Sequence, residues 1–288
     1  MEPDVASIAN SQEIFAMADN LTRAERDLPK LRRYVAQLMS LVNSMLREPI
    51  SYSEKDHLAF MSLCFLSKQA EYLKSICILI DADQCKDAVF IVRNMIEGMS
   101  LLIWAAQDAS TRPLLWRSYA LVEDFRLMKN KEWMGEKIDP TEKSALLERL
   151  RVYGPKFYSE KARKALQRNL PLPEDPYRKT WTGKKVWEIC EETKGQLLYK
   201  QIYQDVSSWM HWSPSSVGTY IYRKNNHVVY VNIATDKAAM ALSSGFQSLI
   251  ETAAVADSHL SLGFADRLAT LRETYINGLL PTLQSLGI

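Results

Sequence analysis

The sequence predicts an all-α protein: a bundle of long helices with one small antiparallel β-hairpin. Apolar residues recur at the three- and four-residue spacing of an amphipathic helix through most of the first 135 residues, and the same spacing returns after residue 196. Residues of β-prone character gather only in two short runs near 219–233. We treat residues 1–288 as a single helical domain with an irregular basic excursion at about 136–195.

The first predicted helix begins at a capping-box pattern formed by Thr22 and Glu25. Apolar residues then follow at helical spacing until Pro49, which cannot continue a helix. The apolar positions that should face the core are Leu31, Val35, Leu38, Leu41, Val42 and Leu46.

Two further helices are expected to form the core of the bundle. One begins at Ser53 and ends at Ile80, and the other follows a short polar joint at 81–86 and ends near residue 108. Because helices on so short a connection pack side by side, residues 54–108 are predicted to be an antiparallel hairpin. A fourth helix is expected after Pro113.

The segment 136–195 has a different character. Asp139-Pro140 and Gly154-Pro155 are interpreted as breaks, and three prolines within 170–176 exclude a regular helix or a central strand there. Residues 142–185 hold 12 Lys or Arg against 5 Asp or Glu, so this is the basic region of the chain. Its aromatic residues are Phe157, Tyr158, Tyr177, Trp181 and Trp187.

Two interpretations of this basic region stay open. Cations interleaved with aromatic rings suit a protein that follows a nucleic-acid backbone and stacks its bases. The alternative is a solvated insert whose tryptophans pack back on the bundle, because charge runs of mixed sign are commonly exposed faces.

Helical periodicity resumes at residue 196 and continues to about 213. The β-prone runs that follow are separated by turn-forming asparagines and predict the hairpin near 219–233, which should lie against helices because a lone hairpin is marginal in water. A helix at 236–260 and a final helix near 264–279 complete the bundle.

Composition narrows the class of protein. A hydrophobic content of 47% and a charged content of 24% are ordinary for a soluble globular chain, and a net charge of +2 gives no global basic field. The amino end lacks a basic segment followed by an apolar stretch, and the apolar stretches are too short to span a bilayer. The four cysteines show no CxxC spacing. We expect a cytoplasmic protein with no membrane partner.

A charged pair interrupts the apolar helix expected before residue 108. Arg93 and Glu97 lie four residues apart, so they share one face of that helix. A buried ion costs several kcal/mol unless it is paired and hydrogen-bonded. The pair therefore either closes a buried structural network or lines a polar site.

A second polar group falls at 203–211. Tyr203, Ser207 and Ser208 precede His211, which is expected near the carboxyl end of a helix that stops before Pro214. Histidine is the side chain best able to move a proton near neutral pH, although a histidine at a helix end also serves as an ordinary hydrogen-bond partner.

These two groups together resemble a widespread bacterial family of unknown function that is built almost wholly of helices. The resemblance covers about 55–260 and rests on an Arg-x-x-x-Glu helix followed far downstream by Tyr, Ser and His; its matching positions are Arg93, Glu97, Tyr203, Ser207 and His211. A more distant similarity is to the helical HEPN ribonucleases, but Gly98, Met99 and Ser100 stand where that pattern needs a histidine.

Two functions fit these features. The first is an effector or toxin-like enzyme that acts on RNA or a nucleotide: Arg93 binds the phosphate, His211 is the general acid or base, Glu97 orients either of them, and hydroxyl groups supply hydrogen bonds. Those hydroxyls belong to Tyr203, Ser207 and Ser208. The second is a non-catalytic helical module that binds a partner protein or small ligand in a stress or phage-defence system.

Other site types have little support in the sequence. The four histidines are widely separated, with no HExxH motif, and the ten glycines form no phosphate-binding loop, so we expect no metal and no cofactor. A homodimer is compatible with the number of aromatic and methionine side chains, although no heptad seam specifies one.

Overall fold

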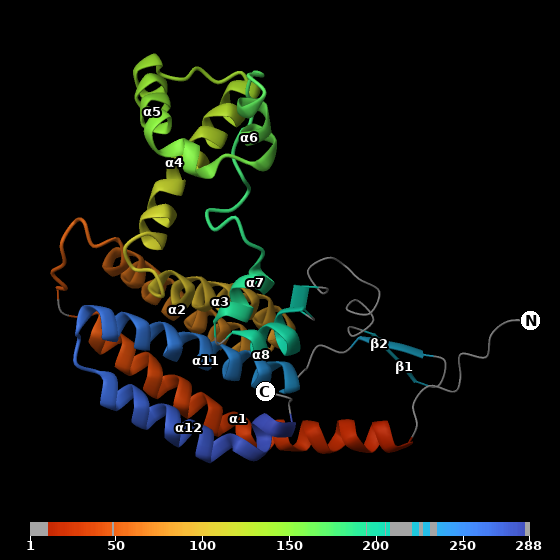
Figure 1. Cartoon of the computed structure of the whole chain (residues 1–288). Coiled ribbons are helices and arrows are strands. Elements are labelled where there is room, and N and C mark those ends of the chain that lie inside the picture. The colour runs from red at the N-terminus through yellow and green to blue at the C-terminus, as the bar shows by residue number, and fades with distance from the viewer. Residues whose placement is uncertain are drawn as a thin grey trace, which may run out of the picture.

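The computed structural model describes residues 11–47, 49–193, 195–204, 206–207, 221–224, 227–230 and 235–285. Over this part of the chain the protein is all-α, as predicted (Figure 1). Its helices are α1 (Ser11–Met45), α2 (His57–Asp81), α3 (Cys85–Ala106), α4 (Arg112–Trp133), α5 (Pro140–Tyr153), α6 (Glu160–Gln167), α7 (Val186–Glu192), α8 (Gln196–Leu198), α11 (Thr235–Leu260) and α12 (Ala265–Ser285), with a 3₁₀ turn η2 (Gly154–Phe157) and a π-helical turn η3 (Tyr199–Tyr203).

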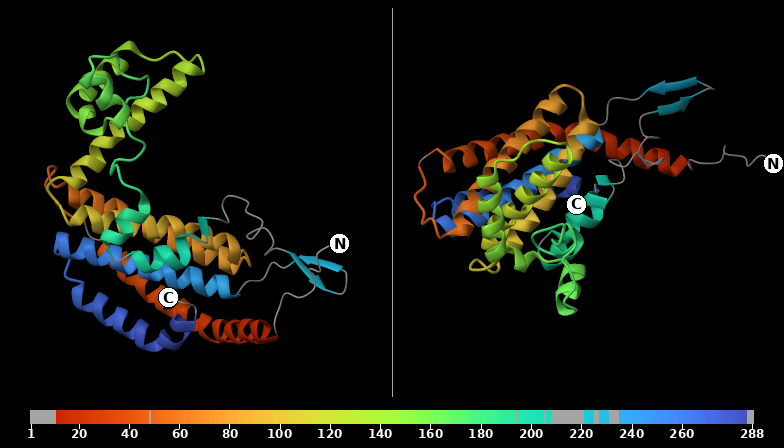
Figure 2. Two further views of the ribbon diagram at one scale, coloured as in Figure 1. Left: turned by 45° about the vertical axis from the view of Figure 1, so that its right-hand side comes forward. Right: turned by 90° about the horizontal axis from the view of Figure 1, so that it is seen from above.

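Helix α11 is the centre of the bundle. It packs against α1, α2 and α3, while α12 covers α1, and Figure 2 shows this arrangement from two sides. Small buried residues on α11 permit the close approach. A Cβ added at Gly245 would lie 2.8 Å from Leu73 Cδ1 of α2, so this position has no room for a side chain.

The helical pair at the core agrees with the expected hairpin, because α2 and α3 pack together across the joint. The predicted start of α2 at Ser53 is wrong. The helix begins at His57, where the Asp56 carboxylate caps it by accepting a hydrogen bond of 2.9 Å from the Ala59 amide. The same carboxylate lies 2.9 Å from His259 Nε2, at the end of α11, so it also ties these two helices together.

Helix α1 is longer than predicted. It begins at Ser11, so the capping-box residues Thr22 and Glu25 lie within the helix, and Pro29 is also inside it. The upstream residues are mostly good helix formers, and they continue the helix through the position at which a cap was expected.

The excursion at 136–195 is not irregular throughout, since it contains α5, η2, α6 and α7. Asp139-Pro140, interpreted as a break, is a helix start: the Asp139 carboxylate accepts a hydrogen bond of 2.7 Å from the Thr141 amide, and Pro140 occupies the first turn. The longest stretch without regular helix is 168–185.

Helix α4 leaves the bundle and carries α5 and α6 at its far end (Figure 1). A second apolar cluster forms along it, in which Tyr119 and the fully buried Phe157 meet edge to face at 5.3 Å. The chain that returns toward α7 is fastened to α4, because Arg126 forms an ion pair with Asp175 and donates a hydrogen bond of 3.0 Å to the Arg178 carbonyl.

The strands β1 (Ile221–Lys224) and β2 (His227–Tyr230) pair antiparallel, with Ile221 opposite Tyr230. The turn between them and the residues around them lie outside the described part of the chain. The complete hairpin near 219–233 therefore stays a prediction.

The expectation that the apolar stretches are too short to span a bilayer needs correction, because among the described residues one helix, α3, is long and apolar enough to do so. It lies in the core between α2 and α11, and 56% of its apolar window is buried there.

Candidate functional site

The charged pair on α3 meets η3 through Tyr203. The Tyr203 hydroxyl donates a hydrogen bond of 3.3 Å to Glu97 Oε2, and the Arg93 guanidinium lies 4.9 Å from the centre of the Tyr203 ring. Helical spacing puts Arg93 and Glu97 on the same side of α3, where one ring can contact both. The expectation of a buried pair needs correction, because both charged side chains are half-buried and only Tyr203 is buried.

This environment holds Tyr203 in its neutral form. Burial, followed by the nearby Glu97 carboxylate, raises the pKa of Tyr203 to about 12, against the opposing effect of Arg93. The phenol is therefore a hydrogen-bond donor at neutral pH and is no source of a catalytic base.

The raised pKa predicts a loss of stability in alkali. Because the pKa of the folded phenol, about 12, exceeds the ordinary value of 10.0, its contribution to stability is complete below pH 10 and disappears as the pH rises toward 12. Replacing Tyr203 with phenylalanine should make the free energy of unfolding fall less steeply over this range. Urea denaturation at a series of pH values measures it, and equal slopes for both proteins would contradict the expectation.

A groove of about 330 Å³ lies on the other side of Glu97, between α2, α3 and α4. Aromatic rings supply much of its wall, and Phe65 and Trp116 meet edge to face at 5.5 Å. The buried Gln69 donates a hydrogen bond of 2.8 Å to the Met95 carbonyl, while its Oε1 has no partner among the described residues. Its lining includes Phe65, Lys68, Gln69, Tyr72, Asn94, Glu97 and Trp116.

The predicted site residues fall into four groups. Glu97 lines the groove, whereas Arg93 and Tyr203 meet on the η3 side of α3 and do not line it. Ser207 is half-buried in the helical residues that follow η3. Ser208 and His211 lie outside the described residues, so the distance from His211 to Glu97 stays open.

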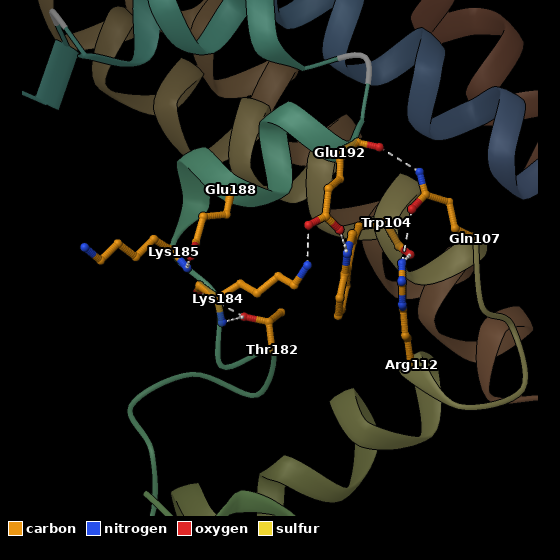
Figure 3. Close-up of polar contacts among 8 residues, drawn as sticks. All are labelled: Trp104, Gln107, Arg112, Thr182, Lys184, Lys185, Glu188 and Glu192. Carbon is orange, nitrogen blue, oxygen red and sulfur yellow. Dashed lines mark hydrogen bonds and ion pairs between the residues drawn. The ribbon is translucent and has the colours of Figure 1, made fainter. Parts of the chain in front are cut away.

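A cluster that the sequence analysis did not identify holds the chain leading to η3 (Figure 3). Glu192, at the end of α7, accepts a hydrogen bond of 2.8 Å from Trp104 Nε1 and forms an ion pair with Lys184. The backbone carbonyl of Glu192 accepts a hydrogen bond of 2.9 Å from Gln107 Nε2. The Arg112 guanidinium lies 4.0 Å from the Trp104 ring centre and donates a hydrogen bond of 2.6 Å to the Trp104 carbonyl. The cluster therefore joins α7 to the α3–α4 corner.

Between this cluster and η3 the chain presses closely on α3. A Cβ added at Gly195 would collide with Ser100 Oγ, which itself accepts a hydrogen bond of 3.3 Å from Cys190 Sγ. Burial raises the pKa of the Cys190 thiol, so it is a packing residue and not a reactive nucleophile. Glycine at 195 thus lets η3 approach α3 closely enough for Tyr203 to reach Glu97.

The aromatic residues of the basic region are largely used in packing. Phe157 is fully buried, and Trp181 packs edge to face against Trp104 with ring centres 5.4 Å apart. Tyr158 and Tyr177 stack on each other. Trp187 is 41% exposed. This arrangement favours the insert interpretation over a base-stacking surface.

One protein family, described as a family of unknown function (DUF5677), matches residues 59–228. The match covers more than half of the chain and includes Arg93, Glu97, Tyr203, Ser207 and His211, so the resemblance to a family of unknown function is confirmed. The likeness to HEPN ribonucleases stays a prediction. No curated protein and no solved structure matches the chain.

Proposed function

This chain belongs to the DUF5677 family, and we propose that it is a cytoplasmic effector that binds a nucleotide or an RNA end with the base in the groove between α2, α3 and α4. The observation that carries the proposal is the position of Glu97. Its carboxylate lines the groove and also accepts the Tyr203 hydroxyl, so a ligand in the groove would contact the same group that holds η3.

The groove residues suit a base and a phosphate. Phe65, Tyr72 and Trp116 supply ring faces and edges on which a planar base can stack. Asn94 and Glu97 can accept hydrogen bonds from the N–H groups of a base. Lys68, whose ammonium lies 5.5 Å from the Tyr72 ring centre, is the cation of the groove and would attract a phosphate.

We propose His211 as the group that exchanges a proton with the substrate. An imidazole with a pKa near neutrality can act as general acid or base, and Ser207 and Ser208 would supply hydrogen bonds nearby. Arg93 was predicted to bind the phosphate; its contact with Tyr203 now supports a positioning role for it. We also propose that residues 219–233, which follow His211 in the chain, form a complete β-hairpin.

The experiment is cleavage of a mixed labelled RNA pool, and of a panel of mononucleotides, by the wild type and by His211→Ala. We expect cleavage by the wild type only, because His211→Ala removes the proposed proton-transfer group. Melting curves of both proteins show whether the variant keeps its fold. A wild type that cleaves no substrate, or a variant as active as the wild type, would contradict the enzyme proposal.

The second candidate is a non-catalytic binding module of a stress or phage-defence system. The contacts of Tyr203 with both charged residues of α3 favour it, since they also work as a tie between two helical elements. On this proposal the groove binds a ligand or partner without chemistry. Nucleotide binding without turnover, unaffected by His211→Ala, would select it over the enzyme.

A further inference from the structure

Helix α6 and the chain that follows it form a second hollow, here called the α6 groove. Asn169, with a φ of +53°, ends the helix and turns the chain back, and the Leu170 amide donates a hydrogen bond of 2.8 Å to the Ala165 carbonyl. Pro171 and Pro173 keep the returning chain stiff and remove two backbone donors. The result is a preformed groove of about 700 Å³ between the helix and the 170–173 segment.

The rim of the α6 groove is positively charged. Lys161, Lys164 and Arg168 line it and are exposed. The acidic residue of the lining, Glu160, forms an ion pair of 2.5 Å with Lys164, which lowers the pKa of Glu160. Within the described residues Lys161 and Arg168 form no ion pair, so their charges are available to a partner.

The walls of the α6 groove are aliphatic. Leu170 is 54% exposed, and Ala165, Pro171 and Pro173 complete the apolar lining, with no aromatic ring among them. A nucleic-acid strand binds through its phosphates and through bases that stack on aromatic rings. The lining of the α6 groove has no aromatic side chain on which a base could stack. Aliphatic pockets bordered by cations instead complement apolar side chains flanked by carboxylates.

We propose that the α6 groove is a docking site for an acidic segment of a partner protein that carries apolar anchor residues. Carboxylates of the partner pair with Lys161 and Arg168, and an apolar anchor packs on Leu170 and the two prolines. Because the cations are exposed, they mainly steer the partner and set specificity, whereas the apolar anchor slows dissociation. The site is distinct from the groove at Glu97 and needs no catalysis.

The test is fluorescence anisotropy of the full chain with three labelled probes of equal length. One peptide alternates glutamate with leucine, a second alternates glutamate with serine, and the third probe is oligouridine. We expect the leucine-containing peptide to bind at least about tenfold more tightly than either of the others, a difference of about 1.4 kcal/mol. Tighter binding of oligouridine, or equal binding of both peptides, would overturn the proposal.

Variants separate the two parts of the site. Arg168→Glu should weaken binding of the leucine-containing peptide about tenfold, because it removes a charge contact. Leu170→Ser should weaken binding of that peptide by the same factor and leave binding of the serine peptide unchanged, because it removes an apolar contact. The side chains of Arg168 and Leu170 are exposed, so neither substitution should change the melting temperature. Lys74→Glu, on an exposed position of α2, is the control for charge alone; an equal loss there would mean nonspecific attraction and would overturn the proposed site.

Discussion

Replacing Glu97 with glutamine is expected to weaken nucleotide binding at least about tenfold, with a small effect on folding. The amide keeps the size of the side chain and can still accept the Tyr203 hydroxyl, but it loses the charge that strengthens hydrogen bonds from the N–H groups of a base. Hydrogen bonds to a charged group contribute about 1.5–3 kcal/mol. Calorimetric titration with the four common mononucleotides measures the loss, which should be largest for the best-bound base.

The matched control is Tyr203→Phe, which removes the hydrogen bond to Glu97 and leaves the carboxylate in the groove. If Glu97 acts as a ligand, Glu97→Gln loses affinity while Tyr203→Phe keeps most of it. If Glu97 only ties η3 to α3, Tyr203→Phe loses affinity and stability, while Glu97→Gln, which can still accept the hydroxyl, loses little of either. The second pattern would refute the direct role of Glu97. Melting curves of both variants complete the comparison.

Replacing Trp104 with alanine is expected to have the largest effect on stability, a loss of about 3–5 kcal/mol. The indole is 5% exposed, packs on Trp181, and holds the Arg112 guanidinium over its ring. Its truncation leaves a cavity at the α3–α4 corner and removes the donor to Glu192. Urea denaturation with an unchanged m-value would measure the loss.

Trp104→Phe separates packing from the polar contact. It keeps much of the ring but lacks the N–H group that donates to Glu192, and the exposed Glu192 carboxylate can bind water instead, so we expect a smaller loss of stability than for alanine. Glu192→Gln should retain the hydrogen bond and lose the ion pair with Lys184, which is partly exposed and therefore contributes little. A Trp104→Ala protein as stable as the wild type would show that the corner repacks without it.

The sequence predicts the part of the site that depends on one helix. Arg93 and Glu97 share a face because of helical spacing, and that face does meet Tyr203. The groove behind Glu97 could not be predicted, because Lys68 and Gln69 come from α2, and which residues face α3 depends on the rotation of one helix about the other. The contact of Trp104 with Glu192 joins residues 88 apart and has no local signal.

Helix boundaries show a similar limit. Proline after aspartate marks a turn in many chains, but at Asp139-Pro140 the same pair starts α5, because proline fits the first turn and aspartate caps it. The expectation of an irregular excursion arose from this ambiguity. A capping pattern followed by Glu142, in the first turn, was the available signal for a helix.

Helix α4 fixes the relative rotation of two distant parts of the molecule, the groove at Glu97 and the region around α5. Trp116 in the groove and Met128 near α5 belong to one helix without glycine, and with proline only at its start. Deleting a single residue between them would rotate the far end by about 100° and shorten it by about 1.5 Å. The fastened return chain could not follow such a rotation. Insertions or deletions in α4 should therefore be tolerated only when they add or remove about a whole helical turn, even at solvent-facing positions.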